Sequence, residues 1–149
     1  MSTISEVNDE TFSSSVLEAD GVVLVEFWAP GCRPCTQVEP ILEELARELD
    51  GRATVAKVDT DASPRTAEKY RIMSLPTILI FAGGEVVASM IGSRPKAAIR
   101  AALTRQPQLY WTYRASRAKR DAVWQHVHKQ LRDLGFPAAQ GETDSADAG

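Results

Sequence analysis

Two cysteines stand where a strand pattern gives way to a helix pattern. Residues 22–28 are an apolar run of strand-forming residues, residues 29–31 interrupt it, and a helix pattern begins at Arg33. Cys32 and Cys35 lie at this junction as a Cys-x-x-Cys motif. A helix N-terminus offers unpaired N–H groups and the positive end of the helix dipole, so it favours the thiolate of Cys32. The motif therefore predicts a strand–turn–helix unit that carries a redox-active thiol pair.

The residues between the cysteines fit this interpretation. Pro34 suits a first helical turn, whose N–H groups have no partner within the helix. Arg33 places a cation beside the first sulfur, and we expect it to lower the pKa of Cys32. The alternative is half of a zinc site or two incidental cysteines. Zinc would need two further ligands, and the two histidines, His126 and His128, lie far along the chain at a spacing that points them apart on a helix. No metal is expected.

Composition narrows the class of protein. The chain has 149 residues, 44% hydrophobic and 25% charged, which is typical of one globular domain with an appendage. A net charge of −3 gives no indication of a nucleic-acid partner. The first residues do not resemble a secretory signal, and no apolar run approaches the ~18 residues that span a bilayer. Because both cysteines belong to one motif, no structural disulfide framework remains, and we expect a cytoplasmic protein.

Apolar periodicity, with glycine and proline as boundaries, predicts an α/β fold with a central mixed sheet flanked by helices. Asn8 or Asp9 is expected to cap the first helix. The strand over 22–28 is apolar almost throughout, so it is expected to be central and covered on both faces. The expected helices are 8–19, 33–50, 65–70 and a helix from 95 to 104; the expected strands are 22–28, 53–58, 77–81 and 85–91, the last two forming an antiparallel hairpin.

The chain divides into three predicted parts: a folded domain over 1–105, a basic amphipathic helical extension over 106–136, and a disordered acidic tail over 137–149. The simplest interpretation of the extension is a helix that packs on the domain or on a second copy, so an oligomer through this helix is possible. Docking to an acidic partner or a membrane surface, and contact with nucleic acid, are the alternatives. Its apolar stripe consists of Tyr110, Tyr113, Trp124, Val127, Leu131 and Leu134.

The motif Trp-Ala-Pro-Gly-Cys-Arg-Pro-Cys and the order of the elements resemble the thioredoxin family over roughly residues 5 to 104. The resemblance implies a thioredoxin fold with an additional C-terminal extension. It implies a thiol–disulfide oxidoreductase that reduces protein disulfides, with Cys32 as the attacking nucleophile and Cys35 as the resolving thiol. It also implies electrons from an NADPH-dependent thioredoxin reductase and no cofactor beyond the redox-active disulfide.

Glu26 is a charged residue inside an apolar strand, and burial would raise its pKa. Thioredoxins commonly carry an aspartate at this position, so the resemblance implies that Glu26 accepts the proton of Cys35, directly or through water. Lys57 matches the family's lysine near that carboxylate and is implied to tune its charge. The alternative for Glu26 and Lys57 is an outward-facing charge pair.

Four further residues are implied in substrate binding. Pro76 matches the cis-proline loop that faces the motif, and Leu75 would pair its backbone with the substrate; the alternative is a trans proline that opens a strand. Trp28 would pack beside the active loop. The alternative, an ordinary aromatic residue of the core, is compatible with that role. Gly92 would let the substrate backbone approach, and its alternative is a turn at the end of a strand.

Two positions depart from the family pattern. Gly31, a further candidate for substrate binding, stands where thioredoxins usually have a tryptophan, which reduces the apolar surface offered to partners. Arg33 stands where glycine is usual, and we expect a more oxidising couple. The alternative function is a thioredoxin-fold chaperone or adaptor whose C-terminal helix binds partners. Retention of both cysteines favours catalytic turnover.

Overall fold

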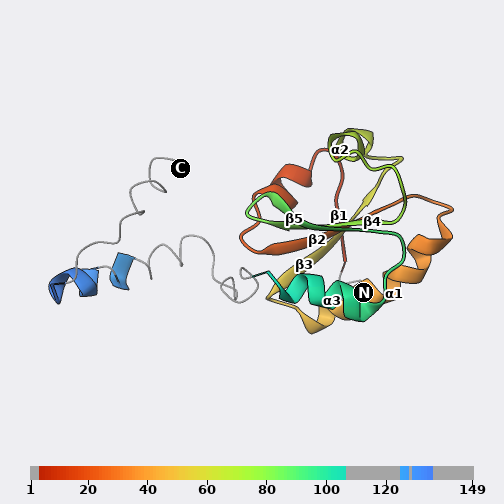
Figure 1. Cartoon of the computed structure of the whole chain (residues 1–149). Helices are drawn as coiled ribbons and strands as arrows, with labels where there is room; N and C mark the ends of the chain where they lie inside the picture. The colour runs from red at the N-terminus through yellow and green to blue at the C-terminus, as the bar shows by residue number, and fades with distance from the viewer. Residues whose placement is uncertain (1–3, 107–124, 128, 136–149) are drawn as a thin grey trace. The chain divides into compact units, whose positions relative to one another are not determined.

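A computed structural model describes residues 4–106, 125–127 and 129–135. The chain separates into two units, Met1–Arg114 and Ala115–Gly149. The first unit contains a five-stranded sheet between two layers of helices (Figure 1). The strand order is β1-β3-β2-β4-β5, and the strands are β1 (Ser5–Glu6), β2 (Val22–Trp28), β3 (Ala53–Asp59), β4 (Thr77–Ala82) and β5 (Glu85–Ile91).

The apolar strand β2 is the centre of this sheet. It pairs in parallel with β3 and antiparallel with β4, while β5 closes the expected antiparallel hairpin with β4. Residues 22–27 are all buried, because both faces of β2 are covered. The predicted mixed sheet is therefore confirmed. The strand β1, which pairs in parallel with β3, was not predicted because two residues are too short to form a recognisable pattern.

The two faces of the sheet carry different helices (Figure 1). Helices α1 (Arg33–Glu48) and α3 (Lys96–Thr104) pack on one face against Leu24, whereas the short π-helical turn η1 (Ser13–Leu17) packs on the other against Val25. Alternate residues of β2 thus point into two separate apolar clusters. Helix α1 contributes Val38, Leu42 and Leu45 to the core, and the adjoining Leu49 is also buried.

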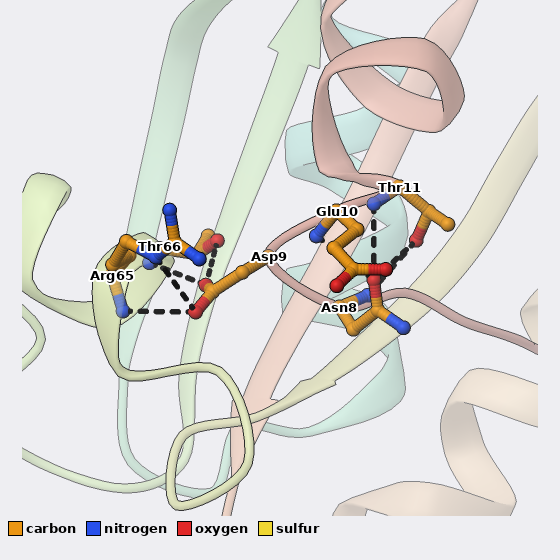
Figure 2. A network of polar contacts seen from close by, with 6 residues as sticks. All are labelled: Asn8, Asp9, Glu10, Thr11, Arg65 and Thr66. Carbon is orange, nitrogen blue, oxygen red and sulfur yellow. Dashed lines mark hydrogen bonds and ion pairs between the residues drawn. The ribbon is translucent and has the colours of Figure 1, made fainter.

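The predicted first helix is wrong in extent, since only η1 forms where a helix over 8–19 was expected. Asn8 does not cap η1, whose N-cap residue is Phe12; its side-chain oxygen accepts hydrogen bonds from the backbone N–H groups of Glu10 and Thr11 at 3.0 Å, in the turn before η1. Asp9 does not cap this segment. Its carboxylate instead accepts hydrogen bonds from the N–H groups of Arg65 and Thr66, the second and third residues of α2 (Pro64–Lys69), as Figure 2 shows. A long-range cap thus satisfies the free N–H groups at that helix start.

In the second unit, residues 125–127 and 129–133 are helical. The helix ends before Gly135, whose φ of +89° lies in the left-handed region that glycine adopts at the end of a helix. Three stripe residues, Val127, Leu131 and Leu134, are exposed there. The expectations for Tyr110, Tyr113, Trp124, His128 and the acidic tail lie outside the described residues, so the division at 105 and 136 stays a prediction. No described helix is both long and apolar enough to cross a membrane.

Candidate active site

Cys32 and Cys35 are joined by a disulfide at the N-terminus of α1, with their Cα atoms 5.3 Å apart. Cys32 is the N-cap residue and has an extended backbone, while Cys35 lies within the first turn. The backbone N–H of Cys35 donates a hydrogen bond to the sulfur of Cys32 at 3.3 Å. Cys32 is half-buried and Cys35 is buried, so the sulfur within reach of a substrate is the one that receives the N–H.

The chain enters this helix through a turn at Gly31. Its φ of +84° lies in the left-handed region, which glycine adopts without strain. Pro34 lies in the first helical turn, where its missing N–H removes no helical hydrogen bond. Arg33, the first residue of α1, is exposed. The local sequence therefore fixes both the change of direction and the helix start that place the two sulfurs.

A cavity of about 90 Å³ lies behind the disulfide. Its lining includes Glu26 and Trp28 of β2, Cys35 and Glu39 of α1, and Gly31 of the loop. The Glu26 residue is only 2% exposed, so it is not an outward-facing charge. Among the described residues, Oε2 of Glu26 and Nε1 of Trp28 are buried without a hydrogen-bond partner. The cavity thus brings an unpaired buried carboxyl group to the same space as both cysteines.

The surroundings of Glu26 raise its pKa to about 7. Burial contributes most, because it disfavours the charged form; the negative charge of Glu39 adds to the rise, and Lys57 opposes it. A carboxyl group with this pKa exchanges its proton near neutral pH. Such a group can act as a general base for a neighbouring thiol.

Lys57 lies beside Glu26 in the sheet register, yet its ion pairs are with other residues. Its Nζ is 2.8 Å from Oε1 of Glu39 and 3.6 Å from Oε1 of Glu6, and it lies 5.2 Å from the ring centroid of Trp28. The hydrogen bond that Lys57 donates to Glu39 contributes most to raising the pKa of Lys57, and the negative charges around it add to the rise against the effect of burial. Sequence reasoning missed Glu39. Its position four residues after Cys35, on the same side of a helix, is the signal that could have found it.

The Leu75–Pro76 peptide bond is cis, as the resemblance implied. Gly92, which follows β5 with a φ of +83°, donates its N–H to the carbonyl of Pro76 at 2.8 Å. Ser93, also missed in the sequence, donates its hydroxyl to the carbonyl of Pro34 at 3.3 Å. The proline loop and the end of β5 are therefore connected to the first turn of α1.

Most of the predicted residues fall into two groups, while Arg33 and Pro34 lie outside both, exposed in the first turn of α1. Those on the cavity are Cys32, Cys35, Glu26, Trp28 and Gly31, with Lys57 reaching it through Glu39. Leu75, Pro76 and Gly92 form the second group, linked to the motif through Ser93. Within the described part of the chain, no group of three or more His, Cys, Asp or Glu residues could hold a metal ion. The disulfide between a half-buried and a buried cysteine at a helix N-terminus, beside a buried carboxyl group, defines a dithiol–disulfide exchange centre.

Comparison with known proteins identifies the family. The thioredoxin family model matches residues 3–105. Thioredoxin 1 of Nostoc sp. is 44% identical over 99 residues, covering 66% of this chain and 92% of that protein. Thioredoxin of Synechocystis sp. is 41% identical over 103 residues, covering 69% and 96%, and thioredoxin 2 of Chlorobaculum tepidum is 46% identical over 91 residues, covering 61% and 84%.

The chain belongs to the thioredoxin family and has the thioredoxin fold. It is a thiol–disulfide oxidoreductase that reduces protein disulfides by dithiol–disulfide exchange through the Cys32–Cys35 pair. Thioredoxins need no cofactor, act on protein disulfides and are reduced by thioredoxin reductase. Residues 106–149 lie outside the family match.

Proposed function

We propose that this protein works in the cytoplasm and receives its electrons from an NADPH-dependent thioredoxin reductase. The observation that carries the proposal is the disulfide itself: one half-buried sulfur at a helix N-terminus and one buried sulfur on a cavity with Glu26. A cytoplasmic location is supported by the cysteine content, because both cysteines belong to the exchange site. The family supports a thioredoxin reductase as the donor, since thioredoxins are reduced by thioredoxin reductase, and its dependence on NADPH is part of the proposal.

In the first step the Cys32 thiolate attacks one sulfur of the substrate disulfide. A bond forms between Cys32 and that sulfur, the substrate S–S bond breaks, and the electron pair leaves with the other substrate sulfur. The N–H of Cys35 and the helix N-terminus stabilise the negative charge on Cys32. Arg33 adds a cation at the residue that follows Cys32, and Pro34 occupies the first helical turn without loss of a hydrogen bond.

In the second step the Cys35 thiol gives its proton to the Glu26 carboxylate. The Cys35 thiolate then attacks the sulfur of Cys32, the mixed disulfide breaks, and the second substrate sulfur leaves as a thiolate. The substrate gains two electrons and the cysteine pair loses two. The shared cavity, which has room for a bridging water, supports Glu26 as the proton acceptor. Lys57 opposes the protonation of Glu26 by its charge.

The substrate is expected to bind over the second group of residues. We assign the backbone of Leu75 to pairing with the substrate chain, Pro76 to shaping the groove, and Gly92 to close approach of the substrate backbone. The hydrogen bonds that connect Gly92 to Pro76 and Ser93 to Pro34 support this assignment, because they hold the groove against the motif helix. Trp28 and Gly31, the other two residues assigned to substrate binding, line the cavity beside the disulfide.

Insulin disulfide reduction tests the proposal, with NADPH and a thioredoxin reductase as the electron source. Robust turnover by the wild type, abolished by Cys32→Ser, is the expected result. Turnover with dithiothreitol but not with the reductase would contradict the proposed donor while leaving the exchange activity in place. Cell fractionation of the native host tests the location. Recovery of the protein outside the cytoplasmic fraction would contradict the proposed location.

A chaperone or adaptor function is the second candidate, and it rests on the exposed apolar stripe of the second unit. Val127, Leu131 and Leu134 are 39%, 39% and 73% exposed, at helical spacing. Prevention of aggregation by a Cys32→Ser, Cys35→Ser double variant discriminates the two functions. Full retention of this effect in the double variant, together with negligible reductase activity of the wild type, would favour the chaperone.

A further inference from the structure

Glu39 occupies a position between the exchange site and the lysine of the neighbouring strand. It lies on α1, one helical turn beyond Cys35, and lines the same cavity as Cys35 and Glu26. Its Oε1 accepts a hydrogen bond from Nζ of Lys57 at 2.8 Å. The side chains of Lys57 and Glu39 are 17% and 35% exposed, so the pair is partly shielded from solvent. Shielding makes both charges act more strongly on their surroundings.

The charged groups around Glu26 come from three elements. Helix α1 presents Glu39 together with the two cysteines, strand β3 presents Lys57, and strand β1 adds Glu6 through its longer ion pair with Lys57. The next charged residue on β3 is Asp59, which pairs in register with Trp28 but does not line this cavity. On the other side β4 faces Glu26 with the apolar Ile78.

The ammonium group of Lys57 therefore forms its ion pairs with carboxylates other than that of Glu26. Lys57 lies next to Glu26 in the sheet register, where it would be the natural counter-ion of a Glu26 carboxylate. Glu39 takes that ammonium group by a direct hydrogen bond and brings a further negative charge to the cavity. Both effects disfavour ionisation of Glu26, and like charges at one site are known to raise proton affinity.

We propose that Glu39 is a positioning residue that sets the proton affinity of Glu26, by its own charge and by its hydrogen bond to Lys57. A glutamate of ordinary acidity is a weak base toward a thiol, because the two groups ionise about four pH units apart. A carboxylate with higher proton affinity takes the thiol proton more readily. Glu39 thereby adjusts Glu26 to its task of deprotonating Cys35. This consequence rests on the proposed role of Glu26.

The test is an NMR titration of the Glu26 side-chain carboxyl carbon in the oxidised full-length protein. Glu39→Gln removes the charge and frees Lys57, so the pKa of Glu26 is expected to fall by about one unit. Glu39→Asp keeps the charge and is expected to lower the pKa of Glu26 by less. Lys57→Met removes the opposing cation and is expected to raise it.

Glu44→Gln is the matched control. Glu44 lies on the same helix and its carboxylate is also 2.8 Å from a lysine, Lys96, but it does not line the cavity. The pKa of Glu26 is expected to be unchanged in this variant. An unchanged pKa in Glu39→Gln, or an equal fall in Glu44→Gln, would overturn the proposal.

The pH profile of mixed-disulfide resolution separates this proposal from the proposed role of Glu26. If Glu26 accepts the proton of Cys35, the acidic limb of the profile moves in Glu39→Gln to lower pH by the same amount as the pKa of Glu26. A pKa that falls while the acidic limb stays in place would support the action of Glu39 on Glu26 and contradict Glu26 as the proton acceptor.

Discussion

Helix α1 carries two lysine–glutamate clusters that look alike in geometry and differ in consequence. In the inner cluster, Lys57 is 2.8 Å from Glu39 and lies beside the buried Glu26. In the outer cluster, Lys96 of α3 is 2.8 Å from Glu44 and 2.6 Å from Glu48, which also pairs with Arg100. The pair distances alone do not tell the two clusters apart.

The difference lies in burial, and it reverses the sign of the pKa shifts. Hydrogen bonds from Lys96 lower the pKa of Glu44 and of Glu48, because solvent-exposed carboxylates gain a cation at little cost. Burial raises the pKa of Glu26 to about 7, and the nearby lysine does not offset it. The inner cluster can therefore change the pKa of a buried carboxyl group, whereas the exposed outer cluster links two helices by ion pairs.

The pH dependence of folding stability is the largest expected difference between the inner and the outer cluster. Below pH 4.5, Glu26 is protonated in the folded and the unfolded chain; between pH 4.5 and about 7, only the unfolded chain releases the proton. Stability therefore falls as the pH rises through this range, by up to about 3 kcal/mol. Glu26→Gln should remove this fall. Urea unfolding of the oxidised protein at a series of pH values measures it.

The control for this prediction is Glu48→Gln in the outer cluster. The pKa of Glu48 is lowered in the folded state, so its contribution has the opposite sign: it is present above the unfolded pKa and is lost on acidification. A fall in stability between pH 4.5 and 7 that persists in Glu26→Gln would contradict the assignment of that fall to Glu26.

The next effect compares the two lysines. Lys57→Met leaves the partly buried Glu39 carboxylate without its hydrogen-bond donor and should destabilise the protein by about 2 kcal/mol. Lys96→Met removes an exposed cation and should have a smaller effect, which disappears at high salt. Urea unfolding at neutral pH, with and without added salt, measures both. Equal losses with equal salt dependence would show that burial does not separate the clusters.

The smallest effect concerns the exposed cation at the start of the same helix. Arg33→Gly should lower the redox potential of the cysteine pair by about 10–20 mV, because an exposed charge stabilises the Cys32 thiolate only modestly. Equilibration against a glutathione buffer measures the potential, and Arg65→Gly on the distant α2 is the control. An unchanged or higher potential in Arg33→Gly would exclude the role proposed for this residue.

Much of this fold could be predicted because its elements are marked by local signals. The apolar run over 22–28 predicts the central strand. The glycines and prolines at the boundaries predict the strands of the hairpin and the start of α1. Asp9 was assigned to the wrong helix because its partners, Arg65 and Thr66, lie far along the chain, and no local pattern reveals a long-range cap. The two residues of β1 are too few for a periodicity.

The candidate site shows the same division. Cys32, Cys35 and Glu26 were predicted, because a motif at a strand–helix junction and a charge in an apolar strand can be recognised from the sequence alone. The partner of Lys57 was not, since the resemblance directed attention to Glu26 and the choice between two carboxylates depends on side-chain packing. Ser93 was missed because a single serine after a strand is compatible with many structural roles.

The most direct test of the account is the rate at which the mixed disulfide on Cys32 is resolved, measured by stopped flow across a range of pH in wild type and Glu26→Gln. We expect a wild-type rate with an acidic limb centred near pH 7, where Glu26 ionises. In Glu26→Gln this limb should be absent and the rate above it about 100-fold lower. The same rate and the same pH profile in both proteins would contradict the claim that Glu26 serves Cys35.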